Sequence, residues 1–168
     1  SHIICGFRCG WMVFSGPKEE LSEVEQGVTA LASMRLCGNT LTQLVIPAAL
    51  SDRQSTRAMM APGGRLYEQS RATVEGLRKI PGVVVEEPMG AFYVMASLPV
   101  DDSDKFQKWL LQEFDDHGDT VMFAPGAPFY ETPGKGINEI RIAYVLKQAD
   151  LERAMDLLAL GIQAYNNR

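Results

Sequence analysis

The hydrophobic and polar positions after residue 64 form a regular succession of helical and extended patterns. Leu66, Val74 and Leu77 fall on one face of a helix, at three- and four-residue spacing, and Pro81 follows where that pattern stops. The predicted helices cover 65–80, 102–114 and 149–165, and the predicted strands cover 83–87, 90–98, 120–126 and 139–145. The order helix, two strands, helix, two strands, helix predicts a compact α/β or α+β domain.

The first 60 residues have a different pattern. The run CGWMVF at 9–14 predicts one strand, and apolar positions from Leu21 to Met34 predict a helix that begins at Pro17. A second helix is expected over 40–51, bent or short because it carries Pro47. One strand cannot satisfy its own backbone groups, so this half is expected to pair with something outside itself. A domain boundary is expected at the Pro-Gly-Gly segment 62–64.

Composition and charge remove several classes of function. The net charge is −5, the sequence pI is about 5.1, and no segment concentrates Lys and Arg, which argues against a nucleic-acid partner. No apolar run approaches the roughly 20 residues that a membrane-spanning helix needs. Three cysteines without a CxxC pair or clustered histidines support neither a disulfide framework nor a metal site. Reduced thiols in a cytoplasmic protein are the simpler interpretation.

Two arginines are the candidate binding residues, because each lies in an apolar segment. Arg8 lies in GFRCG and Arg141 lies in EIRIAYV. Either could be an edge-strand arginine that reaches solvent or one half of a structural salt bridge. The functional alternative is that each guanidinium faces a cleft and holds an anion, since its planar fork matches carboxylate and phosphate. His2 and His117 are too isolated to propose a catalytic triad.

Several segments together resemble one known family. The stretch Gly6 to Gly10 is similar to the glycine-arginine-glycine pattern that follows the catalytic lysine of class I and II aminotransferases, which are fold-type I enzymes using pyridoxal 5'-phosphate. GWMVFSGPK, LASMRLCGN, PGGRLYEQ, GAFYVM, APGAPFY and GINEIRIAYVL resemble further segments of that family, in order, along essentially the whole chain. Ile3 and Cys9 depart from the usual residue types at their positions.

The resemblance implies a fold and a set of site residues. Residues 1–60 would be the C-terminal end of the large cofactor domain, and 61–168 would be the C-terminal small domain, of α+β type. Arg8 would contact the cofactor phosphate, and Arg141 would bind the substrate α-carboxylate. Asn39, together with Arg35, falls where the family brings a loop near the active site, and either residue could instead be structural.

The resemblance also implies a reaction. The chain would belong to an aminotransferase that moves an amino group between an amino acid, such as alanine or aspartate, and a 2-oxo acid, as a cytoplasmic homodimer. The Schiff-base lysine is expected immediately before Ser1, outside this chain, so the fragment alone is expected to be inactive. Alternatives are a carbon-sulfur lyase or cyclopropane-carboxylate synthase, the aminotransferase-like effector domain of a transcription regulator, and a free-standing α/β interaction module.

Overall fold

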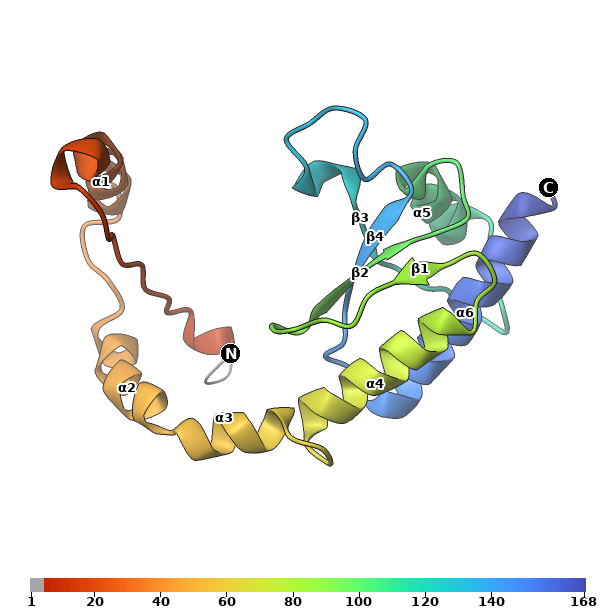
Figure 1. Cartoon of the computed structure of the whole chain (residues 1–168), viewed down its shortest axis with the longest axis horizontal. Coiled ribbons are helices and arrows are strands. Elements are labelled where there is room, and N and C mark those ends of the chain that lie inside the picture. The colour runs from red at the N-terminus through yellow and green to blue at the C-terminus, as the bar shows by residue number, and fades with distance from the viewer. Residues whose placement is uncertain (1–4) are drawn as a thin grey trace. The chain divides into compact units, whose positions relative to one another are not determined.

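The computed structural model describes residues 5–168, which divide into two compact units. The first unit is Ser1–Arg57 and the second is Ala58–Arg168. The division falls inside a helix, α3 (Arg53–Met60), which the sequence patterns do not predict. Figure 1 shows the elements of both units, and each unit is described by itself below.

The first unit is helical in the part that the structure describes. A short 3-10 turn at Cys5–Phe7 is followed by α1 (Lys18–Ser33) and α2 (Thr40–Ser51). Both predicted helices are confirmed, and Pro47 lies inside α2. The predicted strand at 9–14 is wrong: the structure assigns no strand to these residues. A strand needs a neighbour for its N–H and C=O groups, and the described part of this unit contains no second strand.

Little of the first unit is buried. Thr42 is the one buried residue among those described up to Arg57. The apolar face that predicts α1 is present, but Val24 is 53% exposed and Leu31 is 69% exposed. In this chain the pattern therefore marks a helix without a core beneath it.

The second unit contains a four-stranded antiparallel sheet and three long helices, and so confirms the predicted mixed fold. The helices are α4 (Arg65–Arg78), α5 (Ser103–Gln112) and α6 (Gln148–Asn166), and the strands are β1 (Val84–Val85), β2 (Tyr93–Ser97), β3 (Ala124–Pro125) and β4 (Glu139–Ala143). The strand order is β1-β2-β4-β3. Every predicted element of this half is confirmed, although the two edge strands are shorter than the patterns at 83–87 and 120–126.

The helices pack on one face of this sheet and form the core with it. Leu77 of α4, Phe106 of α5 and Leu158 of α6 have no exposed surface, and Val94 and Ile140 meet them from the central strands. Figure 1 shows α4 and α6 running side by side along the sheet. Successive side chains on a strand point to opposite faces, so the neighbours of Val94 and Ile140 point away from the helices.

The opposite face of the sheet contains the candidate site. On it Arg141 of β4 lies directly across from Met95 of β2 and from Ala124 of β3. Tyr93 stands on the same face of β2, two residues before Met95. The neighbouring strands β2 and β3 therefore hold Arg141 from both sides in a fixed register. Among the residues described, no helix is long and apolar enough to cross a membrane.

Candidate functional site

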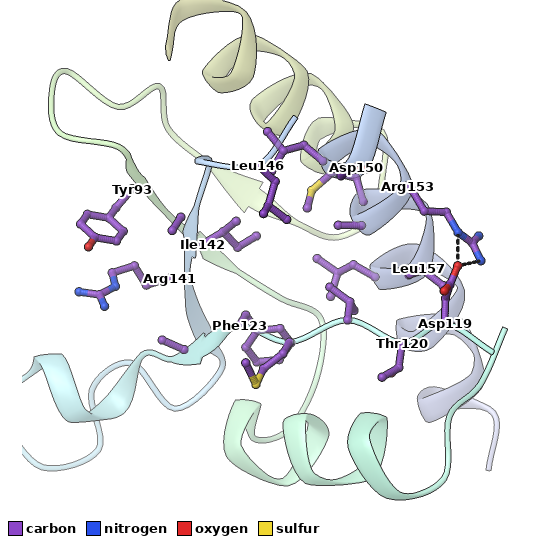
Figure 2. A pocket seen from close by; sticks show the side chains of 18 residues that line it. Tyr93, Asp119, Thr120, Phe123, Arg141, Ile142, Leu146, Asp150, Arg153 and Leu157 are labelled. Atoms are coloured by element: carbon purple, nitrogen blue, oxygen red, sulfur yellow. Dashed lines mark hydrogen bonds and ion pairs between the residues drawn. The ribbon is translucent and has the colours of Figure 1, made fainter. Parts of the chain in front are cut away.

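Arg141 lies between two aromatic rings. Its guanidinium carbon Cζ is 4.3 Å from the centroid of the Tyr93 ring and 4.3 Å from the centroid of the Phe129 ring. Figure 2 shows the Tyr93 and Arg141 side chains projecting together, away from Leu157 and the other residues of α6. Each ring face attracts the cation, by about 0.5–1 kcal/mol at an exposed position. The two rings therefore lie close to the guanidinium group and restrict its position.

No acidic side chain within residues 5–168 forms an ion pair with Arg141. The residue is half-buried, and its neighbours across the sheet, Met95 and Ala124, are uncharged. A guanidinium that is held by rings and lacks a carboxylate partner presents a bidentate donor pair to an incoming anion. The described residues therefore give Arg141 no internal salt bridge, and its predicted contact with a substrate carboxylate stays a prediction.

The position of Tyr93 is fixed by the backbone just before β2. Ala91 has a φ of +58°, a left-handed conformation that is uncommon for a residue with a side chain. Tyr144, at the end of β4, holds this bend: its N–H donates to the Phe92 carbonyl at 3.0 Å and its hydroxyl donates to the Ala91 carbonyl at 3.2 Å. Burial raises the pKa of Tyr144, so its hydroxyl stays protonated as a donor.

Phe129 reaches Arg141 from a loop between β3 and β4. A 3-10 helix at Ala127–Phe129 carries the ring, and the Phe129 N–H donates to the Gly126 carbonyl at 2.9 Å. Gly126 is needed there, because a Cβ on it would lie 2.7 Å from the Glu139 carbonyl oxygen. The loop therefore starts in direct contact with β4, close in sequence to Arg141.

A cavity of about 700 Å³ lies beside Arg141, between the end of β4, residues 119–124 and α6. Its walls are largely apolar side chains, and Figure 2 shows an ion pair of Arg153 with Asp119 at the end away from Arg141. Arg153 also contacts Asp116 at 2.8 Å, and the hydrogen bond to that carboxylate raises the pKa of Arg153. Arg153 is thus occupied by structural partners.

The other predicted site residues lie in the first unit. Arg8 follows the 3-10 turn, is exposed and has a φ of +51°. Asn39 is the N-cap of α2, where its Oδ1 accepts from the Thr42 N–H at 3.3 Å, and Arg35 is exposed just beyond α1. Since the two units are described separately, the predicted ligand contacts of Arg8 and Asn39 stay predictions.

The sequence analysis did not identify the two rings as site residues. Tyr93 lies in GAFYVM and Phe129 in APFY, both within segments already compared with the family, but neither pattern indicates that their rings meet at one arginine. The strand register and the loop closure bring them there. Among the described residues, no three His, Cys, Asp or Glu side chains gather into a candidate metal site.

Comparison with protein families gives one match over nearly the whole chain. The model for aminotransferase class I and II matches residues 3–158. Glutamate-pyruvate aminotransferase AlaA of Escherichia coli is 34% identical over 173 aligned residues, which cover 99% of this chain and 40% of that protein. Alanine aminotransferase of Mycobacterium bovis is 39% identical and covers 98% of this chain and 38% of its own length. This chain therefore spans about two fifths of the relatives it matches.

Solved structures give the same result. An aminotransferase from Escherichia coli superimposes with a TM-score of 0.77 at 34% identity, over 95% of this chain and 39% of its own. An alanine aminotransferase from Pyrococcus furiosus superimposes with a TM-score of 0.63 at 26% identity, over 88% of this chain and 36% of its own. This chain therefore has the fold of part of an aminotransferase.

Proposed function

Because the chain belongs to the class I and II aminotransferases, we propose that it is part of an enzyme that moves an amino group between an amino acid and a 2-oxo acid. The observation that carries the proposal is Arg141, held between Tyr93 and Phe129 without an acidic partner among the described residues. Both substrates of such a reaction carry a carboxylate beside the reacting carbon, and Arg141 is suited to bind it.

The substrate is proposed from the relatives. Those named above are a glutamate-pyruvate aminotransferase and an alanine aminotransferase, which supports alanine and pyruvate as one substrate pair. We assign residues 1–60 to the end of the large cofactor domain and 61–168 to the small domain. The complete enzyme is proposed to be a homodimer of the cytoplasm.

Pyridoxal 5'-phosphate is the proposed cofactor, and Arg8 is the residue of this chain assigned to its phosphate. The chemistry of Arg8 fits that group: a guanidinium donates two parallel hydrogen bonds to phosphate oxygens. The neighbouring backbone leaves space, since a Cβ on Gly10 would meet nothing within 4 Å and Arg8 itself is exposed. When bound, this cofactor supplies the electron sink for the carbanion that forms at the substrate Cα.

The role of this chain in the reaction is to bind the substrate and to orient it. Arg141 fixes the carboxylate by two hydrogen bonds, which removes rotation about one end of a small substrate and sets the direction of the Cα–H bond. The two rings exclude water from the faces of the guanidinium, which strengthens its contact with the anion. Proton transfer at Cα is assigned to a lysine outside this chain. The 168 residues alone are therefore expected to bind a carboxylate but not to transaminate.

A chimera tests the proposed function. The chain would replace the matching part of the Escherichia coli relative, and turnover of L-alanine with 2-oxoglutarate would be measured. We expect activity, and a fall in kcat/KM of roughly 10- to 100-fold for Arg141→Lys, since lysine keeps the charge but loses the bidentate fork. A chimera that folds and binds the cofactor, yet turns over equally well with lysine at 141, would refute the assignment of Arg141.

A further inference from the structure

One carboxylate stands close to Arg141 in sequence and yet does not bind it. Glu139 lies two residues earlier on β4 and therefore on the same face of the sheet. Two residues of a strand span roughly 7 Å between Cα atoms, a distance that glutamate and arginine side chains bridge easily. An ion pair between them would occupy the donor edge that a substrate carboxylate needs.

Glu139 is bound instead by Tyr130. The Tyr130 hydroxyl donates to the Glu139 carboxylate oxygen Oε2. This hydrogen bond raises the pKa of Tyr130 above its ordinary value, so the hydroxyl remains a donor throughout the neutral range. Within the described residues Glu139 has no ion pair, and Tyr130 is its one side-chain hydrogen-bond partner.

The loop between β3 and β4 positions the Tyr130 hydroxyl next to Glu139. Its two ends are joined to β4, where the Gly126 N–H donates to the Glu139 carbonyl at 2.7 Å and the Glu139 N–H donates to the Gly136 carbonyl at 3.1 Å. The Tyr130 ring lies against Gly136, where an added Cβ would come within 2.6 Å of the ring carbons. Gly136 also has a φ of +69°. Glycine is therefore required both to avoid the Tyr130 ring and to adopt this backbone conformation.

The contact of Tyr130 with Glu139 also affects Phe129, the residue directly before Tyr130. Phe129 is 47% exposed and Tyr130 is 42% exposed, so burial does little to hold either ring. The Tyr130 N–H donates to the Ala127 carbonyl at 3.1 Å, which closes the 3-10 turn and couples the direction of one ring to the other. A side chain held at Tyr130 therefore helps to keep Phe129 over Arg141.

We propose that Tyr130 is a positioning residue whose hydroxyl holds the Glu139 carboxylate away from Arg141 and so keeps the ring-held guanidinium open to a substrate carboxylate. The inference rests on the proposed function of Arg141 as the carboxylate-binding residue. It adds that the hydrogen bond from Tyr130 to Glu139 competes with an ion pair between Glu139 and Arg141, and so keeps Arg141 available to the substrate.

The test uses the 168-residue chain, pyruvate as the probe, and the NMR resonance of the Arg141 Nε–Hε group. Tyr130→Phe keeps the ring against Gly136 and frees Glu139. We expect the Arg141 resonance of this variant to shift before any pyruvate is added. We also expect the dissociation constant for pyruvate to rise about two- to fivefold, the size of effect that an exposed ion pair produces.

Three further variants separate this mechanism from a structural defect. Tyr130→Phe with Glu139→Gln removes the competing charge, so the Arg141 resonance and the pyruvate affinity should return to those of Glu139→Gln alone. Tyr67→Phe, a tyrosine of α4 outside the loop, should leave both measurements unchanged. The proposal is overturned if Tyr130→Phe changes neither measurement, or if the double variant remains as impaired as Tyr130→Phe.

Failure of the proposed function gives a different result. If pyruvate binding is absent in the wild type, or persists in Arg141→Gln, then Arg141 is not the carboxylate-binding residue. The ligand-free resonance of Arg141 in Tyr130→Phe still decides whether Glu139 moves to the arginine, and its return in the double variant checks that assignment.

Discussion

At the scale of single residues, the aromatic rings around Arg141 determine what the site can bind. A lone arginine on a strand has many rotamers, whereas a guanidinium between two rings loses most of that freedom before a ligand arrives. Binding then costs less conformational entropy, which is the usual advantage of preorganisation. The rings of Tyr93 and Phe129 should therefore contribute to affinity although neither donates a hydrogen bond to a carboxylate.

Phe129→Leu tests this contribution. Leucine fills much of the same volume but has no ring quadrupole, so about 0.5–1 kcal/mol of cation–π attraction is lost. Because 1.4 kcal/mol is a factor of ten, the dissociation constant for pyruvate should rise about two- to fivefold in an NMR titration. Phe129→Tyr keeps the ring and should bind within about twofold of wild type. Equal affinity for the leucine and wild-type proteins would show that the ring does not matter.

A hydrogen bond between Tyr165 and Asp101 links the free energy of unfolding to pH. The Tyr165 hydroxyl donates to Asp101 Oδ1 at 2.8 Å. That hydrogen bond lowers the Asp101 pKa from its ordinary 3.8, while burial and the same hydrogen bond raise the Tyr165 pKa above its ordinary 10.0. Because the pKa of Asp101 is lowered, this carboxylate stabilises the fold above pH 3.8, and its contribution is lost as the pH falls further. Because the pKa of Tyr165 is raised, this phenol stabilises the fold below pH 10, and its contribution is lost as the pH rises further.

The expected result is a difference that depends on pH. The free energy of unfolding in urea should differ most between wild type and Tyr165→Phe at intermediate pH. The two profiles should converge below about pH 3.8 and above about pH 10, where one partner changes its charge. A constant difference across the whole range would mean that Tyr165 acts through packing alone.

The sequence indicated Arg141 as an anion-binding candidate because a charged residue in the apolar segment EIRIAYV needs a partner, and it left a structural salt bridge or contact with solvent open. It did not indicate Tyr93 or Phe129, since their approach depends on a register that pairs β2 with β4 and on a loop closed through Gly126 and Gly136. These are contacts between distant parts of the chain, and no local pattern encodes them.

At the scale of elements, the close packing of α4 against α6 depends on one glycine. A Cβ on Gly76 would lie 2.8 Å from Met155 Cβ and 2.5 Å from Met155 Cγ. Met155 Cβ is attached to the α6 backbone, so the clash cannot be relieved by moving the end of a side chain. The two helices would have to separate.

Gly76→Ala should therefore destabilise the second unit. Alanine favours a helix by about 1 kcal/mol over glycine, but overpacking a filled interface costs about 1–3 kcal/mol. We expect a net loss in the free energy of unfolding, measured by urea denaturation. Gly27→Ala in α1, where a Cβ would meet nothing within 4 Å, is the matched control and should increase helical circular dichroism. A stabilised Gly76→Ala protein would disprove the close contact.

In the second unit the element types were predictable because the hydrophobic spacing is regular, but the strand lengths were not. β1 is limited to Val84–Val85 and β3 to Ala124–Pro125, at the two edges of the sheet. Pro88 follows the first pattern and Pro125 lies in the second, and proline lacks the N–H that a ladder needs. Apolar residues beyond these short strands contribute to the core or the cavity without strand pairing.

At the scale of the whole molecule, the two units differ in how much they bury. The core residues of the chain, from Val74 to Tyr165, all lie in the second unit. The first unit keeps large apolar side chains in water, among them Leu36 at 90% exposed and Leu41 at 79% exposed. Buried apolar surface is the main source of folding stability, so the second unit should be much the more stable.

Limited proteolysis measures this difference. A protease of broad specificity should cut within residues 8–57 first and leave a resistant fragment of about 58–168. Mass spectrometry of the products would locate the cuts. Loss of both parts at the same rate, or survival of the first unit, would contradict the assignment of stability to the second.

The helical pattern of the first 60 residues predicted the helices α1 and α2 but not whether their apolar faces are covered. α1 has the apolar face that the spacing predicts, while the structure buries none of its residues. The expected strand at 9–14 is not assigned in the structure. Hydrophobic periodicity predicts which face of an element tends to be covered, and it contains no information on which polypeptide covers it.

The proposed binding of a substrate carboxylate by Arg141 can be tested directly by one titration. The 168-residue chain would be titrated with pyruvate and with pyruvamide, its neutral amide, and followed at the backbone amides of β4. We predict saturable shifts centred on Arg141 with pyruvate, none with pyruvamide, and none with either compound in Arg141→Gln. Equal shifts for the two compounds, or pyruvate binding that survives Arg141→Gln, would contradict the account.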